Sequence, residues 1–375
     1  MHDPIIILGA GISGLCTAIA LAQRNIKTVL IERQTHEQLT SPADMRTTAL
    51  TPQSWDFLMR HGIAQALAPR VQQIQRIYVV QEEAYVEFSD TNPLGYMVIN
   101  RNLRQALYAL ALQSPNITFK LGTPYTHITQ DEDSITVFRN GRKISSHLCI
   151  VCEGRNSWAK AQFFDDIWTH DFDQVSITCN IRHANHHRNS ALEHFVARGP
   201  FATLPLVGGY ESGIVFTQSS QMARTMSEPH TLRQMIQELT FTFLGEVEVI
   251  SQPQVWPLWE HAVRKYYRGR LVLCADAAHS VHPLAGQGLN MGIGDVDCLV
   301  GLIHGSASLG LDCEFLSRYQ RLRAGNNLKM LGIMHGINSV FCNKRLNPFT
   351  KCALNVLNGL DGFKTIIRRF AAGQR

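Results

Sequence analysis

The sequence contains no long block of like charge. Its 35 basic and 30 acidic residues leave a formal net charge of +5 over 375 residues. Such a mild balance lacks the basic stripe on which nucleic-acid binding depends, so we expect no nucleic-acid partner. Internal repeats and low-complexity linkers are absent as well. What remains, 45% hydrophobic and 17% charged residues, is typical of a globular protein, and the length predicts two lobes rather than one core.

The sequence also lacks a metal-binding cysteine pattern. Nine cysteines are scattered along it, and no second Cys or His pair at zinc-site spacing accompanies the CxxC of Cys149 and Cys152. Residues 4–23 carry no charge, but three glycines at motif spacing favour a strand, a turn and a helix over a membrane span. No secretory signal is evident, so we expect free thiols in a reducing cytoplasm.

Three glycines follow a short apolar segment near the start of the chain. Residues 9–14 read GAGISG, between a predicted strand over 5–8 and a predicted helix over 14–24. Gly9 allows a tight turn, Gly11 lets a pyrophosphate approach the backbone, and Gly14 permits close packing of helix on strand. Glu32 ends the next predicted strand, where its carboxylate can bind a ribose diol and repel a 2′-phosphate. This unit predicts binding of FAD or NAD rather than NADP.

A second loop of this kind lies far along the chain. Residues 269–295 read GRLVLCADAAHSVHPLAGQGLNMGIGD, which indicates a buried strand, then Asp276, a Gly/Pro-rich loop and a helix opening near Gly288. The backbone N–H groups and the positive dipole end of such a helix favour an anionic ligand. Two loops of this type predict one large, partly anionic cofactor that is bound from two sides.

The pattern of elements predicts an α/β fold. We expect a Rossmann-like FAD-binding domain over 1–70, 98–172 and 262–315, with an inserted, mostly antiparallel β-sheet substrate domain over 71–97 and 173–261. C-terminal helices follow over 316–375. Asn140-Gly141 and Gly208-Gly209 predict hairpins, and the alternation over 175–181 predicts a half-buried strand. Ligands of such folds bind between the lobes.

Residues 282–292, HPLAGQGLNMG, followed by Asp295, carry the clearest family resemblance. With the glycine-rich loop, they resemble the class A flavoprotein aromatic hydroxylases, the p-hydroxybenzoate hydroxylase-like group, and within it the ubiquinone-biosynthesis hydroxylases. The segments RTTAL at 46–50, VINR at 98–101, GPFATLPL at 199–206 and WPL at 256–258 agree in order and spacing. Two positions depart from the group: Glu153 replaces an aspartate, and Ala275 replaces a glycine. We expect Ala275 to cost little if its backbone is strand-like.

The resemblance implies an FAD-dependent monooxygenase of ubiquinone biosynthesis. It would hydroxylate the aromatic ring of a polyprenylated phenol with O2, through a flavin C4a-hydroperoxide, and take electrons from NAD(P)H or a redox partner. A polyprenyl substrate also implies contact with the periphery of the inner membrane or with a ubiquinone-biosynthesis complex. Two alternatives stay open: a hydroxylase of a soluble phenol, and a non-catalytic flavin-binding member of a biosynthetic complex.

The cofactor-contact residues come from the two loops and from the matching segments. Asp276 would bind ribityl hydroxyls, Gly288–Asn290 would present backbone N–H groups to the flavin, and Pro283 would fix the loop beside it. Arg46 would balance pyrophosphate or flavin charge, with a surface salt bridge as the alternative. The full set is Gly9, Gly11, Gly14, Glu32, Arg46, Asn100, Arg101, Asp276, Pro283, Gly286, Gln287, Gly288, Leu289 and Asn290.

Other residues that invite a functional interpretation are assigned ordinary structural roles. His279 and His282 lie in a turn without an evident third ligand, so we expect no metal site. His183, His186 and His187 are predicted to be solvated loop histidines, and Trp256 and Trp259 to be packing residues. No catalytic residue is assigned.

Overall fold

The computed structural model describes residues 3–41, 43–196, 199–222, 228–282, 286–306, 313–341 and residue 350. The predicted contact Pro283 and most of the predicted C-terminal region beyond residue 341 lie outside these residues.

The first lobe is built on a six-stranded sheet in the order β19-β20-β12-β1-β2-β8. Five strands are parallel and β19 is an antiparallel edge strand. The predicted strand, turn and helix at the start of the chain are confirmed. The central strands are apolar because helices cover both faces of a parallel sheet. The strands are β1 Ile5–Leu8, β2 Thr28–Ile31, β8 Ile117–Lys120, β12 Cys149–Val151, β19 Tyr267–Arg268 and β20 Leu271–Leu273.

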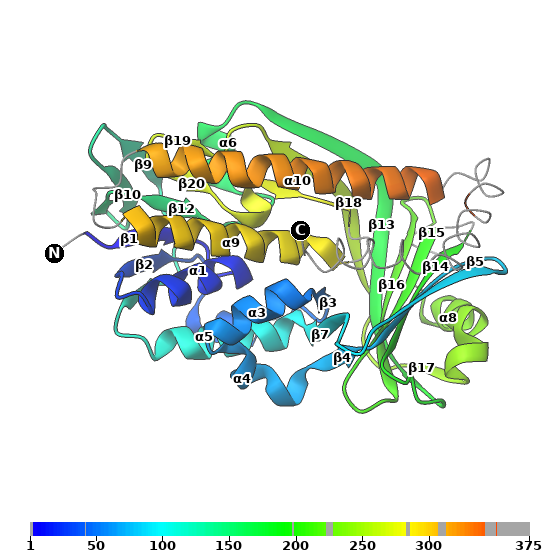
Figure 1. The fold of residues 1–375 in the computed structure, drawn as a ribbon. Helices are drawn as coiled ribbons and strands as arrows, with labels where there is room; N and C mark the ends of the chain where they lie inside the picture. The colour runs from blue at the N-terminus through cyan, green and yellow to red at the C-terminus, as the bar shows by residue number, and fades with distance from the viewer. Residues whose placement is uncertain are drawn as a thin grey trace.

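Helices and two small sheets complete this lobe (Figure 1). The hairpin predicted at Asn140-Gly141 is confirmed, because β10 pairs with β11 across these two residues. The helices are α1 Ile12–Ala22, α2 His36–Thr40, α3 Pro52–Arg60, α4 Ile63–Leu67, α5 Asn100–Leu112, α6 Trp158–Phe163 and α9 Gln287–Ser306. The small sheets are β9 His127–Gln130 with β10 Ile135–Arg139 and β11 Arg142–Ser146, and β3 Thr47–Leu50 with β7 Gly95–Ile99 and β4 Gln72–Ile74.

The second lobe is a nine-stranded, mostly antiparallel sheet, as the sequence predicts. Its order is β21-β18-β13-β16-β15-β14-β5-β6, with β17 also paired to β13. Among the described strands of this sheet, the one parallel pair, β14 with β5, joins the two inserted segments. The strands are β5 Arg76–Gln81, β6 Ala84–Ser89, β13 Ile167–His183, β14 Ser190–Val196, β15 Gly199–Pro205, β16 Glu211–Ser219, β17 Val247–Val249, β18 Gln254–Val263 and β21 His279–Ser280.

Both faces of this sheet are covered, so the half-buried strand predicted over 175–181 is wrong in its exposure. Ile177 and Cys179 pack under α8 (Pro229–Leu244), which lies against one face. Ser176 and Thr178, on the other face, are only 4% and 8% exposed, and they lie in the wall of a cavity. The alternation of apolar and polar residues in this strand therefore does not distinguish the interior from solvent. It distinguishes the face that packs against α8 from the face that lines the cavity.

Helix α10 (Cys313–Phe341) connects the lobes. It runs beside α9 and ends over the nine-stranded sheet (Figure 1). There Phe341 stacks on Phe195 of β14 with ring centroids 4.2 Å apart. The lobe boundaries stay a prediction, although β13 carries a bulge between Asp171 and Gln174, where the sequence places one of them. None of the described helices is both long enough and apolar enough to span a bilayer.

The histidine cluster of this lobe corrects a prediction. His186 is exposed as expected, but His183 and His187 are buried. His183 contacts the carbonyl of Asn185 and the hydroxyl of Ser212, and His187 contacts the carbonyl of Leu206. Burial lowers the pKa of both rings. They are therefore internal polar braces and not solvated loop residues.

Candidate active site

One cavity of about 2260 Å³ extends from the first lobe to the sheet of the second. Small-molecule sites usually measure about 300–1,000 Å³, so this space exceeds what a single ligand needs. Its walls include the glycine-rich loop after β1, the loop after β20, the start of α9, one face of the nine-stranded sheet and the end of α10. The cavity therefore joins the two loops that the sequence pairs.

The three glycines of the first loop have different surroundings. Gly9 has φ +98°, and a Cβ there would lie 2.6 Å from the carbonyl oxygen of Cys152. A Cβ on Gly14 would overlap the carbonyl oxygen of Gly9. Gly11 faces open space, because no atom lies within 4 Å of the point that a Cβ would occupy, and it lines the cavity. Two glycines thus serve close packing, and the third leaves the backbone accessible from the cavity.

Glu32 also lines the cavity, beside this loop. Its carboxylate oxygens accept hydrogen bonds from the backbone N–H groups of Ala10 at 2.7 Å and Gln34 at 2.9 Å. These bonds fix the acid at the end of β2, where the sequence places the ribose contact.

Helix α5 contributes an arginine that the sequence analysis missed. Asn100 and Arg104 both line the cavity, whereas Arg101 is exposed and is not part of its wall. Residues four apart share one face of a helix, and the next residue along is turned away. That spacing is the signal that could have selected Arg104 in place of Arg101. Burial lowers the pKa of Arg104, and the charges of Glu32 and Asp44 oppose this effect.

Arg46 is held in the cavity wall by an acid and an indole ring. Its Nε and Nη2 donate to Asp44 at 2.8 and 2.6 Å, and Asn100 donates to the same carboxylate at 3.3 Å. The guanidinium lies 4.2 Å from the ring centroid of Trp256. Burial lowers the pKa of Arg46, but Asp44 and Asp276 more than reverse the effect. Trp256 is therefore a stacking platform for a cation, which corrects its assignment as a packing residue.

Trp259 is corrected in the same way, because the guanidinium of Arg155 lies 5.5 Å from the centroid of its ring. Both tryptophans and both arginines line the cavity. Each tryptophan ring therefore holds one guanidinium group in this wall by a cation–π contact.

Asp276 projects into the cavity from the 3-10 turn η2 (Ala275–Ala277) after β20. Its side chain is exposed, and it lies in the wall of the cavity. Burial raises the pKa of this carboxyl, while His279, Arg155 and Arg46 act to lower it. An acid in this position can accept hydrogen bonds from hydroxyl groups of a bound ligand.

Ala275 does not have the strand-like backbone on which its low expected cost depends. Its φ is +57°, in the left-handed region that favours glycine. A non-glycine residue there costs about 1–2 kcal/mol. The methyl group also packs closely on α9, because a Cβ added at Gly292 would lie 2.8 Å from that of Ala275. The departure from the family pattern therefore carries backbone strain at the cavity wall.

Four consecutive residues at the start of α9 line the cavity: Gly286, Gln287, Gly288 and Leu289. The side chain of Asn290 is turned away from it and ties the helix to the β3–α3 connection. It accepts from the N–H of Thr51 at 2.8 Å and donates to the carbonyls of Ala49 at 2.8 Å and Gly286 at 3.1 Å. The first turn of α9 is thereby fixed against the cavity, with its N–H groups at the cavity end of the helix.

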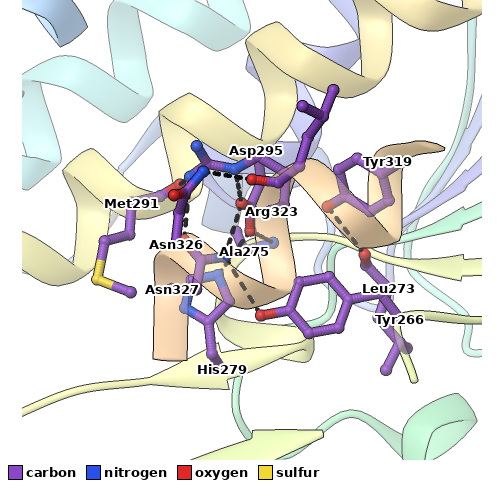
Figure 2. Close-up of polar contacts among 11 residues, drawn as sticks. Tyr266, Leu273, Ala275, His279, Met291, Asp295, Tyr319, Arg323, Asn326 and Asn327 are labelled. Carbon is purple, nitrogen blue, oxygen red and sulfur yellow. Dashed lines mark hydrogen bonds and ion pairs between the residues drawn. The ribbon is translucent and has the colours of Figure 1, made fainter. Parts of the chain in front are cut away.

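Asp295 lies under this wall at the centre of a buried polar network (Figure 2). It is fully buried and contacts His279 at 2.6 Å, Arg323 at 2.6 Å and Asn327 at 2.9 Å. The N–H of Ala275 donates to it at 3.2 Å. Burial raises the pKa of Asp295, but the charge and hydrogen bonds of its partners lower it to about 2. Arg323 and Asn327, missed by sequence reasoning, lie one turn apart on α10.

Glu153, the second departure, directs its longer side chain at the protein itself. One carboxylate oxygen accepts from Tyr125 at 2.9 Å, and the other accepts from Ser157 at 2.7 Å and the N–H of Ala159 at 3.2 Å. These bonds satisfy the start of α6. The glutamate therefore keeps an acid at the cavity wall and anchors it locally.

Fold and site together define a class A flavoprotein monooxygenase. A family described as FAD binding domain matches residues 3–308. Gly11 and Asp276 line one cavity with Glu32 and the start of α9, an arrangement that fits one molecule of FAD held from two sides. The chain therefore belongs to this FAD-binding family, and FAD is its cofactor.

Named relatives agree with this family. The chain is 31% identical over 351 residues to the ubiquinone hydroxylase UbiL of Rhodospirillum rubrum, a match that covers 90% of this chain and 82% of that protein. It is 28% identical to the 3-demethoxyubiquinol 3-hydroxylase of Escherichia coli, a match that covers 87% of this chain and 86% of that protein. The predicted resemblance to ubiquinone-biosynthesis hydroxylases is confirmed.

The fold is shared with solved structures. The p-nitrophenol 4-monooxygenase PnpA from Pseudomonas putida superposes with a TM-score of 0.79 at 17% identity, covering 99% of this chain and 96% of that one. The predicted architecture, an FAD-binding domain with an inserted β-sheet lobe and C-terminal helices, is confirmed at the level of the fold.

Proposed function

We propose that this monooxygenase hydroxylates the aromatic ring of a polyprenylated phenol in ubiquinone biosynthesis. The supporting observation is the apolar part of the cavity, which continues beyond the polar loops between the nine-stranded sheet and α10. A long hydrocarbon tail needs such a channel, whereas a small soluble phenol does not. Its lining includes Val79, Val86, Phe88, Phe195, Met330, Met334, Ile337 and Phe341.

We assign the FAD contacts by position. Gly11 would admit the pyrophosphate, with Gly9 and Gly14 holding the turn, and Glu32 would bind the ribose. Asp276 would bind the ribityl chain, and the N–H groups of Gly288–Asn290 would face the flavin ring. Arg104 joins this set because it lines the cavity beside Glu32. Bound FAD supplies the activation of O2, with electrons from NAD(P)H or a redox partner.

The protein's own contribution is to orient the ring and exclude water. The guanidinium of Arg155 and that of Arg46, which is paired with Asp44, lie next to Asp276, where their N–H groups can stabilise negative charge on a ligand. The substrate is lipid-soluble, and we propose that the chain receives it at the membrane periphery or from a biosynthetic complex.

The decisive experiment is lipid analysis of a strain that lacks the gene. We expect an under-hydroxylated quinone intermediate to accumulate and to disappear when the wild-type gene is restored. A normal quinone content without that intermediate would instead favour the soluble-phenol alternative. If the purified protein binds FAD but never couples its reduction to hydroxylation, the non-catalytic alternative holds.

A further inference from the structure

One acidic side chain faces the apolar part of the cavity, and none of the described residues is its partner. Glu193 lies on β14, and it is the only charged residue that the described strands of the nine-stranded sheet contribute to the cavity wall. No hydrogen bond or ion pair to Glu193 is found within the described part of the chain. An unpaired carboxylate in such a place is costly unless a ligand supplies the missing partner.

The strand register fixes what surrounds Glu193. Its direct neighbours across the sheet are Val79 on β5 and Ala202 on β15. Ala191 and Phe195, two residues away on the same face, are apolar, and α10 presents Met330, Met334, Ile337 and Phe341 to Phe195 and Val79. No titratable group among these described residues faces the carboxyl. Burial alone raises the pKa of Glu193, to about 8.

The same row of the sheet leads from Glu193 to the polar part of the cavity. Ala202 pairs with Val215, and Val215 pairs with Thr178. Thr178 accepts a hydrogen bond from the indole of Trp256 at 3.3 Å, and Trp256 supports Arg46. Three strand spacings separate the backbones of Glu193 and Thr178, which is about 14 Å. An aromatic ring placed between them has Glu193 on one side and the proposed cofactor contacts on the other.

We propose that Glu193 binds the phenolic hydroxyl of the substrate and accepts its proton. This inference rests on the proposed function. The reacting form is the ionised carboxylate of Glu193. The O–H bond of the phenol breaks, the proton passes to a carboxylate oxygen of Glu193, and the electron pair stays on the phenolate oxygen. From there it is delocalised into the ring, which makes the ring carbons better nucleophiles toward an electrophilic oxygen. The carboxylic acid so formed donates a hydrogen bond back to the phenolate and keeps the ring in place.

A chromophoric phenol tests the binding step on the FAD-loaded protein. The probe is 4-nitrophenol, whose ionised form is yellow, and the variants are Glu193→Gln and Glu248→Gln. Glu248 lies on β17 of the same sheet with 71% of its side chain exposed, so it controls for the substitution itself. The proton that the probe loses stays on Glu193, and the resulting carboxylic acid stabilises the phenolate by a hydrogen bond that is stronger than one from an amide. We therefore expect the apparent pKa of the bound probe to be about one unit or more lower in the wild type and the control than in Glu193→Gln.

Hydroxylation in the gene-deletion strain tests the catalytic step. Glu193→Gln should reduce it about 10²-fold or more with unchanged FAD content, and Glu193→Asp should recover part of it. A probe pKa shift without hydroxylation by the wild type would reject the proposed function and leave Glu193 as the phenol contact. Equal probe pKa values, no probe binding by either protein, or full hydroxylation by Glu193→Gln beside an active wild type would each overturn the inference.

Discussion

At the scale of single residues, two glycines three positions apart answer to different constraints. Gly14 has no room for a side chain, because a Cβ would overlap the carbonyl oxygen of Gly9. Gly11 has room, and its open side is the cavity. Gly14 is therefore required by the fold, and we expect Gly11 to be required by the cofactor.

Substituting Gly11 should separate folding from cofactor binding. We expect Gly11→Val to unfold at the same temperature as the wild-type apoprotein but to bind FAD at least about tenfold more weakly, a loss of about 1.4 kcal/mol or more. Titration with FAD and thermal unfolding measure the two quantities. Gly301→Val, at an open position on the exposed side of α9, is the control and should keep full flavin occupancy. A Gly11→Val protein that purifies with full FAD would contradict the assigned contact.

Residue-level features were predictable where the signal is local. The GxGxxG spacing and the Asn140-Gly141 hairpin follow from backbone preferences of adjacent residues. The left-handed backbone of Ala275 was not predictable from adjacent residues. It occurs where Ala275 packs closely against Gly292 on α9. Burial of Ser176 escaped prediction for a similar reason, because Ser176 faces the cavity between the lobes, which neither lobe forms alone.

At the scale of elements, one carboxylate joins three segments. Asp295 on α9 contacts His279 beyond η2 and Arg323 on α10, and the N–H of Ala275 donates to it. The turn that carries Asp276 is therefore held from below by the network that Figure 2 shows. The sequence placed Asp295 next to the glycine-rich loop pattern, but nothing local indicated that its partners would come from α10.

Removing that charge should be far more damaging than removing a nearby one. Asp295→Asn leaves Arg323 without its counter-charge in the interior, and we expect a loss of roughly 3–5 kcal/mol in the free energy of unfolding. Asp297 lies on the same helix as Asp295 and forms an exposed ion pair with Arg60 of α3. Asp297→Asn breaks this pair and should cost about 1 kcal/mol or less. Urea unfolding at neutral pH compares the two variants. Equal losses in the free energy of unfolding would show that the network around Asp295 does not stabilise the fold more than an exposed ion pair does.

The same carboxylate sets a pH dependence. Folding lowers the pKa of Asp295 from its ordinary 3.8 to about 2, so its ionisation stabilises the native state fully above the higher value. That stability, about 2 kcal/mol, is lost as the pH falls through the lower value. The difference between wild type and Asp295→Asn should therefore narrow in acid.

At the scale of the whole molecule, the cavity belongs to neither lobe alone. Its polar end is formed by loops of the parallel sheet, and its apolar end by the nine-stranded sheet and α10. Hydrophobic periodicity predicted both lobes, yet it could not select Glu193 or Met334, because the pairing of distant strands decides which face a side chain lines.

Narrowing the apolar end should affect long substrates selectively. Met334 lines the cavity from α10, so Met334→Trp should lower hydroxylation of a polyprenylated phenol at least about tenfold by occupying space that the tail needs. Binding of a tail-free phenol should be unchanged. Leu328→Trp, 62% exposed on the same helix, is the control. An equal loss for both substrates would show that the tail does not pass Met334.

The parallel pairing of β14 with β5 has a consequence for synthesis. Arg76 pairs with Ser190, 114 residues later in the chain (190 − 76). At about 5–20 residues per second, a ribosome takes roughly 6–23 s to make that stretch. Throughout this interval the β5–β6 hairpin has only two strands, a unit that is marginally stable in water. We therefore expect the β5–β6 hairpin to stay without its neighbouring strand until β14 has been synthesised. During this interval we expect the emerging chain to depend on chaperones.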